Sequence, residues 1–181
     1  MDINEYNKRV GRAIITEEEL AEGVKRAGKY IDEIYDGRPI LLVSILKGSF
    51  VFLADVARSV TVPCEIGFMC AKSYYAGTES TGEVKITMDL DQDIKDYHVV
   101  IIEDIIDSGR TLSQVVAILR QRSPLSLRVL TLLDKPSRRA VEFTADLALF
   151  TIPDYFVIGY GLDCAEYYRN LKYVAEYNQE I

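Results

Sequence analysis

The stretch from Val99 to Leu119 constrains the fold most, because its hydrophobic pattern changes once, at a short turn that carries acidic residues. Four consecutive β-branched apolar residues, Val99–Ile102, are typical of a strand that is buried on both faces. Thr111–Leu119 is typical of a helix. A strand that runs through a tight turn into a helix presents backbone N–H groups and the positive end of the helix dipole, which favour an anion, most often a phosphate.

Three carboxylates lie between this strand and this helix, beside the expected phosphate. Glu103 and Asp104, at the predicted end of the strand, could hold sugar hydroxyls or a hydrated Mg²⁺ ion. Asp107, in the turn, could move a proton. The alternative is an ordinary turn with solvated acids. Carboxylates clustered at the end of a buried strand need partners, which favours a binding site.

The length of 181 residues fits a single domain over residues 1–181 with one full core. A formal charge of −7 disfavours sequence-independent binding of nucleic acid. We expect no signal peptide, and no apolar run is long enough for a membrane span. Cys64, Cys70 and Cys164 form no C-x-x-C pair, so we expect reduced cysteines and a cytoplasmic protein.

A second strand, Ile40–Leu46, also runs through a turn into an apolar helix, Phe50–Arg58. Lys47 and Gly48 in that turn could form a second site for an anion. A surface lysine in a loop explains the same residues equally well. A third strand, Leu127–Leu133, ends in a charged cluster, and ligands of open α/β sheets bind at such strand ends.

The charged cluster after the third strand contains Lys135, Arg138 and Arg139, and we expect the two arginines to be solvated surface. Further along, Phe156 could stack on a planar base and Val157 could offer backbone groups to its edge, although a core strand explains both residues too. Residues 72–83 have almost no aliphatic side chains, so we expect a mobile loop there rather than a plain hairpin.

Several of these segments resemble one family. Residues 103–111 resemble the motif with which type I phosphoribosyltransferases bind phosphoribosyl pyrophosphate (PRPP). Residues 46–49 are similar to the pyrophosphate loop of the hypoxanthine–guanine members, in which the peptide before the lysine is often cis. Residues 155–163 and 167–171 match the C-terminal segment of that family. The resemblance implies a doubly wound, mainly parallel α/β sheet with a small hood built from the N-terminal segment and residues 153–181.

The resemblance also implies roles for individual residues. PRPP and its 5′-phosphate would be bound by Glu103, Asp104, Asp107, Ser108, Gly109, Arg110 and Thr111. Pyrophosphate would be bound by Lys47, Gly48, Ser73, Tyr74 and Arg169, with the Ser73–Tyr74 pair closing over the site. The purine would be bound by Lys135, Phe156, Val157 and Asp163, and the metal ion by Glu103, Asp104 and Asp163. Arg110 could pair with the 5′-phosphate or point to solvent.

The implied reaction transfers the 5-phosphoribosyl group from PRPP to N9 of hypoxanthine, and of guanine too. IMP or GMP and pyrophosphate would form with Mg²⁺, and Asp107 would be the acid–base group at the purine N7. Lys135 would select 6-oxopurines because it donates to the exocyclic oxygen. The family suggests a homodimer or homotetramer. Two alternatives remain open: a xanthine or pyrimidine phosphoribosyltransferase, and a non-catalytic regulator that senses PRPP and binds nucleic acid, against which the acidic charge and Asp107 argue.

Overall fold

The larger part of the molecule is a six-stranded sheet in the order β4-β3-β2-β5-β6-β7. We analysed a computed structural model, which describes residues 2–76 and 79–179, without the side chains of residues 72–83. The strands are β2 (Ile40–Ile45), β3 (Cys64–Ala76), β4 (Glu79–Met88), β5 (His98–Ile106), β6 (Ser126–Asp134) and β7 (Leu147–Thr151). All neighbouring pairs are parallel except β3 and β4, so the predicted, mainly parallel sheet is confirmed.

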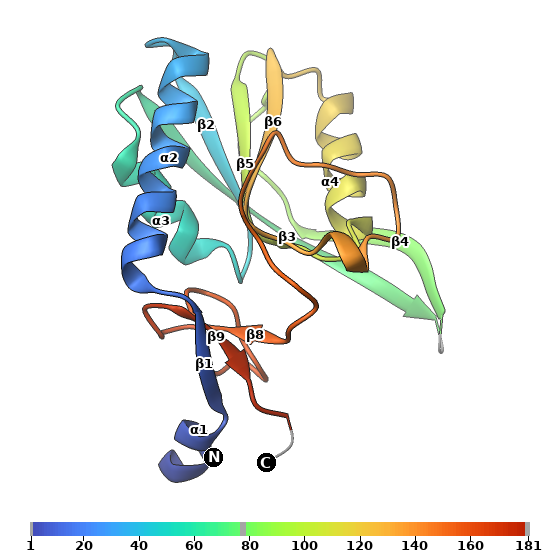
Figure 1. The fold of residues 1–181 in the computed structure, drawn as a ribbon. Helices are drawn as coiled ribbons and strands as arrows, with labels where there is room; N and C mark the ends of the chain where they lie inside the picture. The colour runs from blue at the N-terminus through green and yellow to red at the C-terminus, as the bar shows by residue number, and fades with distance from the viewer. Residues whose placement is uncertain (1, 77–78, 180–181) are drawn as a thin grey trace.

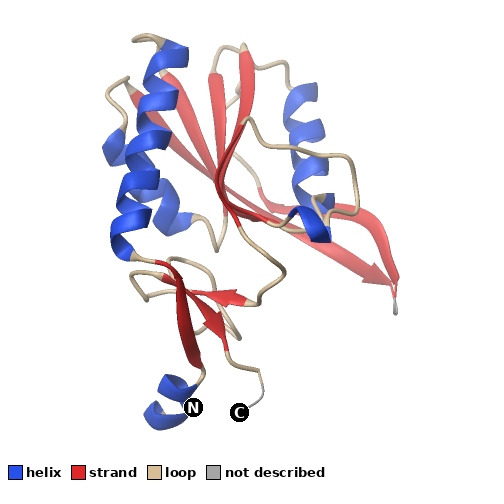
Figure 2. Cartoon of the chain, in the orientation of Figure 1, coloured by secondary structure: helices blue, strands red, loops and turns tan. Residues whose placement is uncertain are grey.

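Helices cover both faces of this sheet. On one face lie α2 (Glu17–Tyr35) and α3 (Phe50–Ser59), and on the other lies α4 (Arg110–Gln121) (Figures 1 and 2). Alternate side chains of β2 serve the two sides: Leu42 packs with the residues of α2 and α3, while Leu41 packs with those of α4. This burial on both faces is the doubly wound arrangement that the continuous apolar runs predict.

A second, three-stranded sheet in the order β1-β9-β8 forms the hood. Its strands are β1 (Val10–Ile15), β8 (Val157–Ile158) and β9 (Val174–Tyr177), and α1 (Ile3–Lys8) precedes it. Figure 1 shows both chain ends in this layer, beyond the end of the large sheet. The rings of Tyr6 and Tyr168 stack with centroids 4.2 Å apart and help to hold the two terminal segments together. The predicted hood is therefore confirmed.

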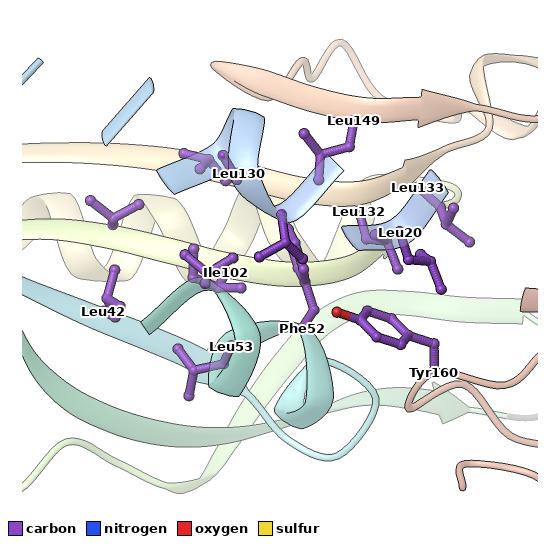
Figure 3. Packing of buried hydrophobic residues seen from close by; sticks show 14 of the residues in the cluster. Leu20, Leu42, Phe52, Leu53, Ile102, Leu130, Leu132, Leu133, Leu149 and Tyr160 are labelled. Atoms are coloured by element: carbon purple, nitrogen blue, oxygen red, sulfur yellow. The ribbon is translucent and has the colours of Figure 1, made fainter. Parts of the chain in front are cut away.

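One side chain of the hood reaches into the main core. Tyr160 is buried beside Phe52 of α3 (Figure 3), and its hydroxyl donates a hydrogen bond of 2.5 Å to Asp55 Oδ2. Burial, together with this carboxylate, raises the pKa of the Tyr160 hydroxyl. The hood is thus attached to the sheet layer through apolar packing as well as through its own loops.

Two differences separate the fold from the prediction. First, the sequence analysis expected a loop rather than a hairpin at residues 72–83, but the pairing of β3 with β4 extends into this segment and reaches Ala76 and Glu79. The side chains of Ser73 and Tyr74 lie outside the described residues, so their roles remain predictions. Second, the short strands β7 and β9 were not predicted. In the described part of the chain, no helix is long and apolar enough to cross a bilayer.

The close approach of the hood to the Lys47 loop gives a first prediction. Gly161 has φ +101°, and a Cβ there would lie 2.1 Å from the carbonyl oxygen of Gly48. Gly161→Ala should therefore lower the free energy of unfolding by about 1–3 kcal/mol more than Gly37→Ala does. Gly37 is the matched control, because it has φ +77° with nothing within 4 Å of the added carbon. Urea unfolding measures both, and equal losses would contradict the need for close contact.

Candidate active site

The carboxyl ends of the parallel strands β2 and β5 border one cavity of about 270 Å³. It is lined by residues 45–48, Ala71, residues 103–109, Thr111 and Leu112. The two strand–turn–helix segments that the sequence singled out therefore face each other across a single space. This edge of the sheet is where open α/β folds bind their ligands.

The turn between β5 and α4 borders the cavity with the start of a helix. Gly109 is the residue before α4 and has φ +77°, a conformation that favours glycine. The amino end of a helix presents N–H groups and a positive dipole end to an anion. Ser108 and Thr111 line the cavity, as expected for phosphate ligands, whereas Arg110 is exposed and does not line it. The position of Arg110 matches the solvent-facing alternative.

The predicted boundary of the central strand was wrong. Strand β5 runs on to Ile106, because its pairing with β6 continues to Ile106 and Asp134. Glu103 and Asp104 therefore lie inside the strand and not at its end. Both still line the same cavity.

Burial dominates the electrostatics of these two carboxyl groups. It raises the pKa of Asp104 to about 6, with the charge of Asp163 adding to the shift. The pKa of Glu103 is also well above its ordinary value, first through burial and then through the charge of Asp104. Glu103 Oε2 is buried without a hydrogen-bond partner among the described residues. A buried carboxyl oxygen of this kind is suited to a cation or a hydroxyl donor.

Gly48 is required by the position of Asp104. A Cβ at residue 48 would lie 1.6 Å from Asp104 Oδ2, so the carboxyl group packs directly against the glycine backbone. The peptide between Leu46 and Lys47 is cis, as expected. The Asp104 side chain of the central strand is thus in direct contact with the Gly48 backbone of the Lys47 loop.

The two cations assigned to pyrophosphate share one carboxylate. Glu166 Oε2 lies 3.0 Å from Lys47 Nζ and 3.1 Å from Arg169 Nη2. Arg169 also pairs with Asp163 at 3.0 Å. Hydrogen bonds from Lys47 and from Arg169 lower the pKa of Glu166. The structure therefore brings Lys47, Arg169 and Asp163 together, and it adds Glu166, which the sequence analysis missed.

The residues assigned to the purine gather beside the cavity rather than in its wall. Lys135 is only 7% exposed; its Nζ donates to the carbonyl oxygen of Tyr155 and lies 4.0 Å from Asp154 Oδ1. Phe156 is 44% exposed, and its ring centroid lies 5.4 Å from that of Tyr177. Val157 is buried in β8. Lys135 thus adjoins the segment before Phe156, but none of the three residues lines the 270 Å³ cavity.

Comparison with known proteins identifies the family. The profile of the family described as "Phosphoribosyl transferase domain" matches residues 13–165. The hypoxanthine phosphoribosyltransferase of Salmonella typhimurium is 48% identical over 171 residues, which cover 93% of this chain and 96% of that protein. The chain belongs to the hypoxanthine–guanine phosphoribosyltransferase family.

Other members of this family are also similar to this chain, in sequence and in fold. The hypoxanthine-guanine phosphoribosyltransferase of Streptococcus pneumoniae is 41% identical, over 95% of this chain and 96% of that protein. A crystal structure of a hypoxanthine phosphoribosyltransferase from Staphylococcus aureus superimposes with a TM-score of 0.92 at 41% identity, covering 96% of this chain and 94% of that one.

One prediction for the charged cluster after β6 was wrong. Arg139 is not solvated surface: its side chain is 17% exposed, and its guanidinium donates to the Asp134 carboxylate and to the Asp107 carbonyl oxygen. Arg138 is about half exposed, and its Nε donates to Asp107 Oδ1 at 3.2 Å. The signal in the sequence was Asp134, an acid at a strand end that needed a nearby cation.

A dedicated metal cage is absent from the described residues, where no three His, Cys, Asp or Glu side chains converge. This fits Mg²⁺ in this family, because Mg²⁺ usually binds one or two carboxylates together with substrate phosphates and water. Glu103, with its unpartnered oxygen, and Asp104, with its raised pKa, are suited to such a role. Asp163 acts on Asp104 electrostatically but is itself engaged with Arg169.

A larger cavity of about 770 Å³ lies between α2, α3 and residues 160–172. Both apolar and charged side chains of the two helices line it, and of the predicted site residues it contacts only Arg169. The smaller cavity is lined by the carboxylates, the start of α4 and the Lys47 loop, so it is the better candidate for the active site.

The raised pKa of Asp104 gives a prediction for stability against pH. Its pKa is about 6 in the folded protein and about 3.9 when unfolded, so the fold is destabilised as pH rises through this window. Asp104→Asn should match the wild type near pH 4 and become more stable by up to about 3 kcal/mol at pH 7. Urea unfolding in EDTA measures this, with exposed Asp91→Asn as the control. A difference that does not change with pH would contradict the assignment.

Proposed function

We propose that this chain transfers the 5-phosphoribosyl group from PRPP to N9 of hypoxanthine, and of guanine too, in purine salvage. One observation carries the proposal: a helix start, two buried carboxyl groups and a lysine–glycine loop line a single cavity. PRPP presents three chemical groups in that order, a 5′-phosphate, ribose hydroxyls and a pyrophosphate. Each finds a suitable partner along the wall.

PRPP binds with its 5′-phosphate on the turn from Asp107 to Thr111, where backbone N–H groups and the hydroxyls of Ser108 and Thr111 donate hydrogen bonds to the phosphate oxygens. Glu103 and Asp104 accept hydrogen bonds from the ribose hydroxyls. Glu103 and Asp104 would hold Mg²⁺, which supplies positive charge to the pyrophosphate when bound, and Asp163 would join them only when Arg169 turns from it to the pyrophosphate. The pyrophosphate contacts Lys47, Gly48 and Arg169, with Ser73 and Tyr74 covering it.

The chemical step breaks the bond between C1 of the ribose and the pyrophosphate oxygen, while N9 of the base forms the new bond to C1. Lys47 and Arg169 stabilise the negative charge that develops on the leaving group. Asp107 accepts the proton that the purine loses at N7. Phe156 and Val157 hold the base, and Lys135 donates to its exocyclic oxygen, which adenine lacks.

The same proposal extends to the assembly and the location of the protein. Phe50 and Phe68 are 43% and 42% exposed and line a shared pocket of about 380 Å³ with Leu46, next to Lys47 and Arg169. Apolar side chains gathered in this way support burial against a second copy, in a homodimer or homotetramer. The three free cysteines support a reducing compartment, the cytoplasm.

Turnover with separate bases tests the proposal. With PRPP and Mg²⁺, we expect nucleotide to form from hypoxanthine and guanine, and not from adenine or uracil. Lys135 provides the reason, because its ammonium group donates to a 6-oxo group and cannot accept from a 6-amino group. Turnover of xanthine or a pyrimidine alone would overturn the base assignment. Binding of PRPP without any turnover, together with binding of RNA or DNA, would favour the regulator.

Glu166 gives a prediction about pyrophosphate. Its carboxylate occupies both Lys47 and Arg169, so an incoming pyrophosphate has to compete with it. Glu166→Gln should therefore bind Mg²⁺-pyrophosphate about 2–10-fold more tightly, the range expected for losing two exposed ion pairs. Calorimetric titration measures this. Glu176→Gln is the control, because it also removes one exposed ion pair of the hood, with Arg12 at 3.2 Å. Weaker binding by the Glu166 variant would mean that Glu166 orders the cations for the ligand.

A further inference from the structure

Arg139 connects the ends of two neighbouring strands. Strands β5 and β6 are paired up to Ile106 and Asp134, and the chain leaves each strand there. One nitrogen of the Arg139 guanidinium donates to the Asp134 carboxylate, and the other donates to the carbonyl oxygen of Asp107. A single planar group thus bridges the end of β6 and the first residue after β5.

The residues after Arg139 hold the same turn from a second direction. Ala140 N donates to the carbonyl oxygen of Ser108 at 2.9 Å. A Cβ at Gly109 would lie 3.2 Å from Arg139 Cδ and 3.3 Å from Val141 Cγ2. Two successive carbonyl groups of the turn are therefore bound by two successive residues of this segment, which fixes the backbone that carries Asp107.

The bridge depends on the shape of arginine. The guanidinium is planar and presents several donors in a fixed arrangement, so it can bind two acceptors at once. A lysine in the same place keeps the charge but is a point donor on a flexible chain. The Arg139 side chain is 17% exposed, so solvent cannot easily replace either hydrogen bond if a lysine fails to form it.

We propose that Arg139 is a positioning residue for Asp107. It holds the main chain of Asp107 so that the carboxylate lies at the purine nitrogen from which it takes a proton. This inference rests on the acid–base role given to Asp107 in the proposed function. Misplacement of a reacting group by about 1 Å can cost a factor of about 10² in rate.

The first test is the variant Arg139→Lys in the full-length protein. We expect kcat to fall about 10–100-fold, while the dissociation constant for PRPP changes less than about 3-fold, because the Ala140 bond to the phosphate turn remains. The matched control is Arg128→Lys, which alters an arginine–aspartate pair with Asp146 (2.7 Å) near the other end of β6. Its turnover should equal that of the wild type. A normal kcat for Arg139→Lys, or a loss of PRPP affinity as large as the loss of kcat, would overturn the inference.

The second test separates positioning from a structural effect. Asp107→Asn alone should lower kcat by about 10²–10⁴-fold. If Arg139 acts through Asp107, adding Arg139→Lys to that variant should lower kcat by less than about 3-fold more. The same factor in both backgrounds would overturn the inference and leave the proposed function in place. A normal kcat for Asp107→Asn would overturn both.

A third variant changes the carboxylate that binds Arg139 instead of the arginine itself. It keeps the inference testable if the arginine variants misfold. Asp134→Asn removes the charge that anchors the guanidinium, while its main-chain carbonyl still accepts from Ile152 N at 2.9 Å. We expect kcat to fall about 3–10-fold, with the same loss of effect in the Asp107→Asn background. An unchanged kcat would show that the bridge does not set the position of Asp107.

Discussion

The close contact between Asp104 and Gly48 determines how the rest of the site is arranged. The carboxyl oxygen occupies the space that a side chain at residue 48 would need, and the Gly48 carbonyl in turn excludes a side chain at Gly161. The central strand, the Lys47 loop and the hood therefore meet through two glycines. The absence of side chains at these two positions lets a strand carboxylate, a lysine and an arginine near the C-terminus lie close together, although they are far apart in the sequence.

The charges at this meeting point are compensated within the protein. Glu166 lies between Lys47 and Arg169, Asp163 pairs with Arg169, and Arg139 pairs with Asp134. The pair Glu103 and Asp104 differs, because burial raises the pKa of both carboxyl groups and Glu103 Oε2 has no hydrogen-bond partner among the described residues. A cation or a set of hydroxyl donors supplies what the pair lacks. The site is thus prepared for a ligand that brings both phosphate oxygens and hydroxyl groups.

Much of this could be predicted because continuous apolar runs mark strands that are buried on both faces. The strands β2 and β6 and the helices α3 and α4 follow their predicted ranges to within two residues. The end of β5 could not be predicted, because Glu103 and Asp104 belong to a strand only through pairing with β6. The four residues of β9 likewise form a strand only because β1, from the other end of the chain, lies beside them.

The site residues also fall into two groups, those that local sequence can assign and those that depend on a distant segment. Those inside a strand–turn–helix segment could be assigned from local sequence, since the turn and the helix start define what they can bind. Arg139 and Glu166 could not, because each acts on a segment that the fold places beside it. The pairing of Ile106 with Asp134 puts the charged residues after β6 next to the turn after β5. In a parallel sheet, a charged residue after one strand should therefore be judged by the turn of the neighbouring strand, and an arginine that follows an acid at such a strand end is a candidate brace for that turn.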